Sequence, residues 1–164
     1  MIILSFTLRN KRANKISTFA EMAKQKKYTL AFEQTFDFDM VGICSHHSDY
    51  RLAWGINECL AIQLCRCEED YIVTNRKGEA ISSHSMYEFA DEENRLDYFL
   101  VKNKIHGNYL IPEKPSIDYF LFLCDNSAID IQRLTKQLKT VKSILGVYPF
   151  EPEEIDSAEY LVFR

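Results

Sequence analysis

The chain has 164 residues, of which 46% are hydrophobic and 27% are charged, and its net charge is −4. These values are typical of one globular domain with its own core, and they exclude a membrane-spanning helix because no apolar run approaches the roughly 20 residues that such a helix needs. The acidic balance disfavours nucleic acid as a partner of the main body.

Residues 1–26 differ in composition from the rest of the chain. Residues 1–27 hold seven Lys and Arg against one Glu, so the remainder is acidic. We predict a basic N-terminal extension, loosely ordered or non-native, with Met22 as the natural start; the alternative is a short strand followed by a helix that Ser17 caps. A signal peptide is not expected, because the basic cluster follows the apolar patch at residues 2–8. We therefore expect a cytoplasmic protein whose five cysteines are free thiols.

An alternating strand and an amphipathic helix open the body of the chain. Apolar and polar residues alternate over residues 28–40, which predicts a long strand with one buried face, ended by Gly42. Ser45 or Ser48 is then placed to cap a helix that runs to about residue 62 with an apolar stripe along one side.

The same helix carries the best candidate for a recognition surface. Arg51, Trp54 and Glu58 are three and four residues apart, so they share a second face of the helix. A partly exposed Trp between Arg and Glu is typical of a protein-binding hot spot. The alternative is that Trp54 packs against a neighbouring loop.

Four strands and a proline-containing junction follow. The expected strands cover residues 64–68, 71–75, 80–89 and 95–105, and turn-forming segments separate them. Residues 119–124 are apolar at both alternating positions, which predicts a strand buried on both faces. Pro112 and Pro115 cannot lie inside a central ladder, so residues 112–116 are predicted to form a bulge or wide turn before that strand. Such a corner is either a structural bracket or a binding feature.

The C-terminal part of the chain predicts one more helix and one more strand. The helix is expected over residues 128–145, where Gly146 ends it, and a short closing strand is expected at residues 160–163. Together the elements predict an α+β fold, with two helices packed on one face of a mostly antiparallel sheet, as a single domain over residues 27–164.

Three sequence blocks resemble a known family. Residues 111–113 and 117–119 read Ile-Pro-Glu, three residues, then Ile-Asp-Tyr, which resembles the motif of the IPExxxVDY family of bacterial proteins with Ile in place of Val. Residues 43–54 and residues 91–94 resemble two further blocks of the same family. The resemblance covers the chain from about residue 27 onward and implies no activity, because none is assigned to the family.

The familiar motifs of catalysis and cofactor binding are missing from the sequence. It has no phosphate-binding glycine loop and no nucleophile elbow, so we predict no cofactor and no catalytic residue. Cys44, His46 and His47 are weak candidates for a metal site or a Cys–His nucleophile before the first helix.

Glu113 and Asp118 are candidate paired carboxylates for acid–base chemistry. The alternative is a structural salt bridge or backbone cap, in which Asp118 pairs with Arg51 or Arg95 and so joins two of the motif blocks.

We therefore carry three functional hypotheses forward. The first is a non-catalytic protein-binding or adaptor domain that contacts an unknown protein through Arg51, Trp54, Glu58 and the nearby Glu113. The second is an enzyme of unrecognised type that uses Cys44 and His46 with the two acids. The third is nucleic-acid binding through the basic N-terminal segment, although charged segments of this kind are more often simply solvated.

Overall fold

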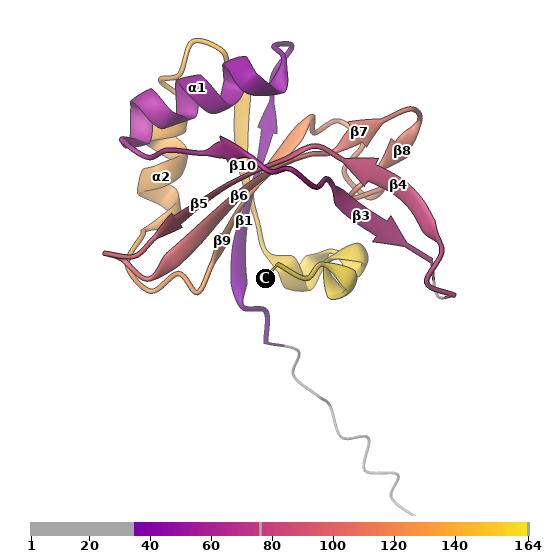
Figure 1. The fold of residues 1–164 in the computed structure, drawn as a ribbon. Coiled ribbons are helices and arrows are strands. Elements are labelled where there is room, and N and C mark those ends of the chain that lie inside the picture. Colours follow the sequence, from indigo (N-terminus) through magenta and orange to yellow (C-terminus); the bar gives the residue numbers. More distant parts are fainter. Residues whose placement is uncertain (1–34, 76, 164) are drawn as a thin grey trace, which may run out of the picture. The chain divides into compact units, whose positions relative to one another are not determined.

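A computed structural model describes residues 35–75 and 77–163 (Figure 1). The predictions for residues 1–26 therefore lie outside the described residues. The elements within the described residues are, in chain order, β1 (Phe38–Cys44), α1 (Asp49–Leu60), β2 (Cys65–Arg66), β3 (Tyr71–Thr74), β4 (Ala80–His84), β5 (Met86–Asp91), β6 (Leu96–Lys102), β7 (Lys104–Ile105), β8 (Asn108–Tyr109), β9 (Tyr119–Cys124), α2 (Ile131–Leu138), β10 (Gly146–Phe150) and the 3₁₀ turns η1 (Pro152–Glu154) and η2 (Asp156–Tyr160).

An antiparallel sheet organises the described residues. Six strands follow the order β10-β1-β9-β6-β5-β2, and the hairpins β3–β4 and β7–β8 form two small sheets of their own. The predicted α+β class is confirmed. Neither helix in the described part of the chain is long and apolar enough to cross a bilayer.

Strand β9 lies at the centre of the large sheet, between β1 and β6. Tyr119, Leu121 and Leu123 belong to the core cluster on one face, whereas Phe120 and Phe122 belong to the cluster on the other face. The prediction of a strand covered on both sides is therefore confirmed.

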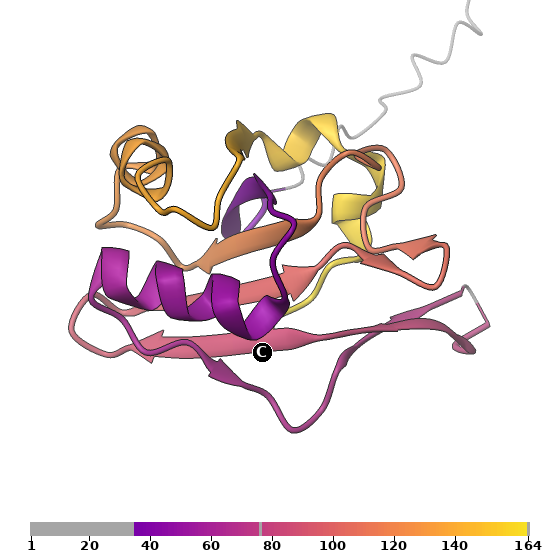
Figure 2. The ribbon, with the colours of Figure 1, turned by 90° about the horizontal axis from the view of Figure 1, so that it is seen from above.

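Both helices cover the same face of the sheet. Leu52 and Ile56 of α1 pack in one cluster with Leu134 and Leu138 of α2 and with the odd-numbered residues of β9. Figure 1 and the view from above in Figure 2 show the two helices together on one side of the central strands.

Irregular segments cover the opposite face. Residues 110–117 and the C-terminal turns contribute this second cluster, including Ile155, Ala158 and Leu161. The predicted closing strand at residues 160–163 is wrong, because the 3₁₀ turn η2 ends at Tyr160 and no strand follows it in the described residues. The three apolar residues recur at every third position, which matches the three residues per turn of a 3₁₀ helix.

Gly42 was predicted to end the first strand, but it lies inside β1. A Cβ at this position would lie 2.6 Å from Cε2 of Phe150, so a glycine allows the Phe150 ring to pack across the strand. Within the described residues the strand begins at Phe38, after residues 35–37, and the first part of the predicted strand, residues 28–34, lies outside them.

Helix α2 is shorter than the predicted helix over residues 128–145. The side chain of Asp130 caps it by accepting a backbone hydrogen bond at 2.8 Å, and the side chain of Asn126 accepts one from Ile129 at 2.8 Å, which holds the preceding residues in a loop. Leu145, the last residue of the predicted helix, is instead 65% exposed immediately before β10.

Each of the two long predicted strands divides into two elements. The breaks fall at Ser85 and Asn103. At the second break, the N–H of Asn103 donates a hydrogen bond to the carbonyl of Asp118 at 2.8 Å. Beyond the breaks, β4 pairs with β3 and β7 pairs with β8, so two hairpins leave the large sheet (Figure 1).

Ala61→Gly is expected to raise the free energy of unfolding by about 0.5–1 kcal/mol. Ala61 ends α1 with a φ of 55°, a left-handed conformation in which a Cβ is strained. Urea unfolding measures the change. Ala90→Gly, at an exposed position of β5, is the matched control and should lower stability; a loss at position 61 as well would contradict the explanation.

Candidate functional site

Asn103 organises the junction between β8 and β9, and no motif in the sequence pointed to it. Its side chain is fully buried. The amide nitrogen donates to the carbonyls of Lys114 and Ile117 at 3.0 and 2.8 Å, and the amide oxygen accepts from the N–H of Ile111 at 2.9 Å. One side chain therefore closes the proline-containing corner from within.

Asp118 joins two of the motif blocks, but through different partners from those predicted. Its Oδ1 lies 3.0 Å from Nζ of Lys104, and its Oδ2 accepts a hydrogen bond from the backbone N–H of Ser45 at 3.0 Å. The predicted ion pair with Arg51 or Arg95 is wrong.

The sheet register explains this difference. Lys104 follows Asn103 directly, and Asn103 is bonded to Asp118, so the ammonium group reaches the carboxylate. Arg95 lies in the turn between β5 and β6, beside the other end of β9, and Arg51 is exposed on α1.

Glu113 holds the C-terminal turns in place. Its carboxylate accepts hydrogen bonds from the backbone N–H and the hydroxyl of Ser157, both at 2.8 Å. Burial alone would raise the pKa of Glu113, but the bonds from Ser157 and the charge of Lys114 outweigh it and lower that pKa below its usual value. Glu113 is therefore ionised and acts as a cap for η2.

Asp118→Ala is expected to lower the free energy of unfolding by about 1–3 kcal/mol, because it leaves the N–H of Ser45 without an acceptor. Lys104→Ala is the matched control, and its loss should stay below about 1 kcal/mol because both members of the ion pair are partly exposed. Urea unfolding of the two variants measures the difference. Equal losses would show that the ion pair, not the backbone hydrogen bond, carries the stabilisation.

The loop with Cys44, His46 and His47 does not form a metal centre in the described residues, where no group of three or more His, Cys, Asp or Glu side chains is placed to hold an ion. The Cys44 thiol donates to the carbonyl of Ser116, and burial, followed by the charge of Asp118, raises its pKa. Both effects disfavour the thiolate that a metal or a nucleophilic reaction requires.

The exposed face of α1 has the composition predicted for a recognition surface. Trp54 is 65% exposed, and Arg51 and Glu58 beside it are also exposed. Tyr50, one turn before Trp54, is 68% exposed and was not singled out from the sequence, although the spacing of four residues could have indicated it. We call Tyr50, Arg51, Trp54 and Glu58 the α1 face.

Glu113 does not belong to the same surface as the α1 face, contrary to the expectation. It is bonded to Ser157 of η2, which packs on the face of the sheet opposite the helices. A partner that contacts Trp54 is thus separated from Glu113 by the sheet.

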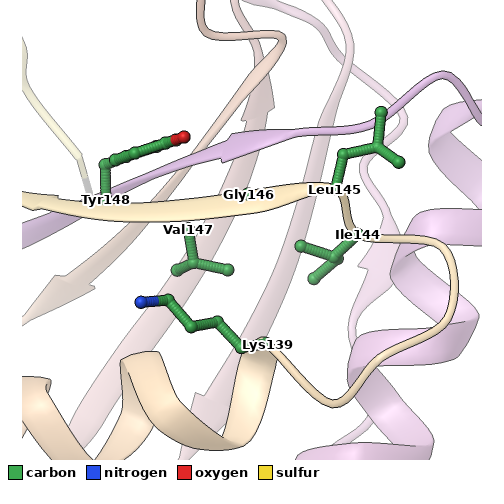
Figure 3. Close-up of a pocket in the computed structure, with 6 residues that line it drawn as sticks. All are labelled: Lys139, Ile144, Leu145, Gly146, Val147 and Tyr148. Carbon is green, nitrogen blue, oxygen red and sulfur yellow. The ribbon is translucent and has the colours of Figure 1, made fainter.

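A shallow cavity of about 360 Å³ lies between the end of α2 and the edge strand β10. Figure 3 shows Lys139, Ile144 and Val147 on the side of β10 that faces α2, whereas the ring of Tyr148 lies on the other side, over Gly146. Ile144 and Val147 are buried core residues, so this cavity is a gap at the margin of the core.

A Ser–His pair that sequence reasoning missed lies on β4. Ser82 Oγ is 2.7 Å from Nε2 of His84, and Nδ1 of His84 is 2.8 Å from the carbonyl of Lys102. This resembles a nucleophile held by an oriented base. His84 is fully buried behind Ser82, however, so it cannot deliver a proton to a leaving group.

Two of the three blocks that carry the family resemblance meet in the structure. Ser45 and Asp118 are hydrogen-bonded, whereas residues 91–94 lie in the turn at the opposite end of β9, beside Cys124. The chain matches no protein-family model and no curated protein. The resemblance of the sequence blocks to the IPExxxVDY family therefore stays a prediction.

Proposed function

We propose that this chain is a non-catalytic protein-binding or adaptor domain whose α1 face contacts the partner. The observation that carries the proposal is the exposure of Trp54, 65%, on a helix whose opposite side is buried in the core. Trp, Tyr and Arg are the residues most often found at the energetic centres of protein interfaces. The α1 face contains one of each.

The chemistry of the α1 face indicates the kind of partner. Tyr50 and Trp54 are exposed aromatic residues one helical turn apart, and Arg51 and Glu58 add charges of both signs. A partner surface with an apolar pocket rimmed by an acidic and a basic group fits this pattern.

The positions of the acids support a non-catalytic role. Glu113 and Asp118 hold backbone groups and Lys104, and the Cys44 thiol is bonded to a carbonyl. All five cysteines are free thiols, which fits the expected cytoplasmic location. Nucleic-acid binding through residues 1–26 stays a prediction, because that segment lies outside the described residues.

Trp54→Ala is expected to weaken partner binding by at least about tenfold, as is usual for a buried aromatic hot spot. Affinity purification from the native cell with mass spectrometry identifies the partner. Surface plasmon resonance with the immobilised partner then measures the Kd of the wild type and of Trp54→Ala. The free energy of unfolding should change by less than about 0.5 kcal/mol, because the ring is exposed in the free chain. Tyr148→Ala, at an exposed aromatic residue on β10, is the matched control. Retention of the same partners with unchanged affinity would contradict the proposal.

A further inference from the structure

A second, larger cavity is lined by residues of the β3–β4 hairpin, the β7–β8 hairpin and the C-terminal turns. Figure 1 shows where the strands β3, β4 and β8 lie in the fold. The volume of the cavity is about 720 Å³, within the range of about 300–1,000 Å³ that is usual for small-molecule sites. Three separate parts of the chain line it: the β3–β4 hairpin, residues 107–112 and residues 157–161.

The lining is mainly apolar, and its polar side chains, from Thr74, Asn75, Ser82, Asn108 and Ser157, are neutral. None of the described residues that line the cavity is an Asp, Glu, Lys, Arg or His. Ile72 and Ile81 remain 49% and 53% exposed, and Tyr71, Leu110 and Leu161 line the same space. A charged ligand would lose its hydration against these described residues without gaining an ion pair from them, so they favour neutral molecules.

Ser82 supplies a polar group of fixed direction. Nδ1 of His84 faces the carbonyl of Lys102, which accepts only, so Nδ1 carries the proton and Nε2 is an acceptor. Burial lowers the pKa of His84, which keeps the ring neutral. The hydroxyl proton of Ser82 is consequently directed at Nε2, and the free lone pairs of its oxygen are available to a donor in the cavity.

We propose that this cavity binds a neutral, mainly apolar small molecule that donates a hydrogen bond, from a hydroxyl or amide group, to Oγ of Ser82. The volume fits a small molecule, the neutral side chains of the described lining residues favour uncharged ligands, and the Ser82–His84 pair fixes the polarity of one hydrogen-bonding contact. This site is distinct from the α1 face, so it stands independently of the proposed protein-binding function.

The test compares an alcohol with its methyl ether, which lacks the hydrogen-bond donor, and adds a carboxylate as a charged ligand. ¹⁵N-labelled full-length protein is titrated with decan-1-ol, with decyl methyl ether and with decanoate, and amide shifts are followed by NMR. Decan-1-ol is expected to shift resonances of β3, β4, β8 and η2. The ether should bind about three- to tenfold more weakly, as the loss of one neutral hydrogen bond implies, and decanoate more weakly still.

Two variants separate the contributions. Ser82→Ala should reduce the affinity for decan-1-ol to that for the ether and leave the ether unaffected. Because this change also leaves Nε2 of His84 without its donor, Ile81→Glu at a half-exposed position is an independent variant and should weaken all three ligands. Leu145→Glu, at an exposed position outside this cavity, is the control.

Three results would overturn the proposal. The first is the absence of shifts in the cavity at saturating decan-1-ol. The second is equal affinity for the alcohol and the ether in both the wild type and Ser82→Ala. The third is a dimer, seen by sedimentation, that Ile81→Glu dissociates while decan-1-ol does not bind, since a second copy of the chain would then cover the cavity.

Discussion

Asn103→Ala should lower the free energy of unfolding by about 3–5 kcal/mol, a large share of the stability of a small domain. The side chain is fully buried and bonds three backbone groups, those of Ile111, Lys114 and Ile117. Its removal leaves an N–H and two carbonyls inside the corner without partners. Urea unfolding followed by far-UV circular dichroism measures the loss.

Two further variants show whether hydrogen bonds or packing cause this loss. Asn103→Leu keeps most of the side-chain volume and removes every polar atom, so a loss that persists in this variant is due to the hydrogen bonds. Asn94→Ala is the matched control, because Asn94 bonds only Asp91 in an exposed turn and its loss should stay below about 1 kcal/mol. Similar losses at positions 103 and 94 would contradict the role given to Asn103.

The elements that could be predicted from the sequence are those with a local signal. Residues 119–124 carry apolar side chains at every position, and a central strand is the arrangement that buries both faces of such a run. The α1 stripe predicted its buried side and left Trp54 on the outside, where the structure has it. Pro112 and Pro115 predicted the irregular corner because proline lacks an amide donor.

The details that could not be predicted depend on contacts between distant residues. The pairing of Asp118 with Lys104 follows from the register that β6, β7 and β9 adopt, and no local pattern distinguishes Lys104 from Arg51 or Arg95. The same holds for Glu113, whose partner Ser157 is 44 residues away. Gly42 was interpreted as a strand end, but its missing side chain leaves room for the ring of Phe150. Phe150 comes close to Gly42 because its strand, β10, pairs with β1.

The candidate site shows the same division. The α1 face was accessible to sequence reasoning because its residues lie on one helix. The larger cavity was not, since its walls come from three segments that only the departure of the hairpins from the sheet brings together. The Ser82–His84 pair has the spacing of two residues that places side chains on one face of a strand, and this is the signal that could have indicated it.

Phe122→Ala is expected to lower the free energy of unfolding by about 3–5 kcal/mol. Phe122 is fully buried on the face of β9 that no helix covers, and its ring centroid lies 4.5 Å from that of Phe163 and 5.5 Å from that of Phe38. The cavity left behind cannot be filled by α1 or α2 shifting inward, because the proline corner, the C-terminal turns and residues of β3 cover this face.

A double-mutant cycle identifies the physical origin of that loss. Phe163 lies against the rings of Tyr71, Phe99 and Phe122, so the C-terminal segment completes the aromatic cluster. The coupling between Phe122→Ala and Phe163→Ala should be about 0.5–1.5 kcal/mol, as for other aromatic pairs. Phe36→Ala, at a partly exposed ring near the margin of the cluster, is the matched control and should cost much less. If Phe122→Ala destabilised the protein no more than Phe36→Ala, the face of β9 opposite the helices would not be a core, because a real core responds to a lost ring with a cavity.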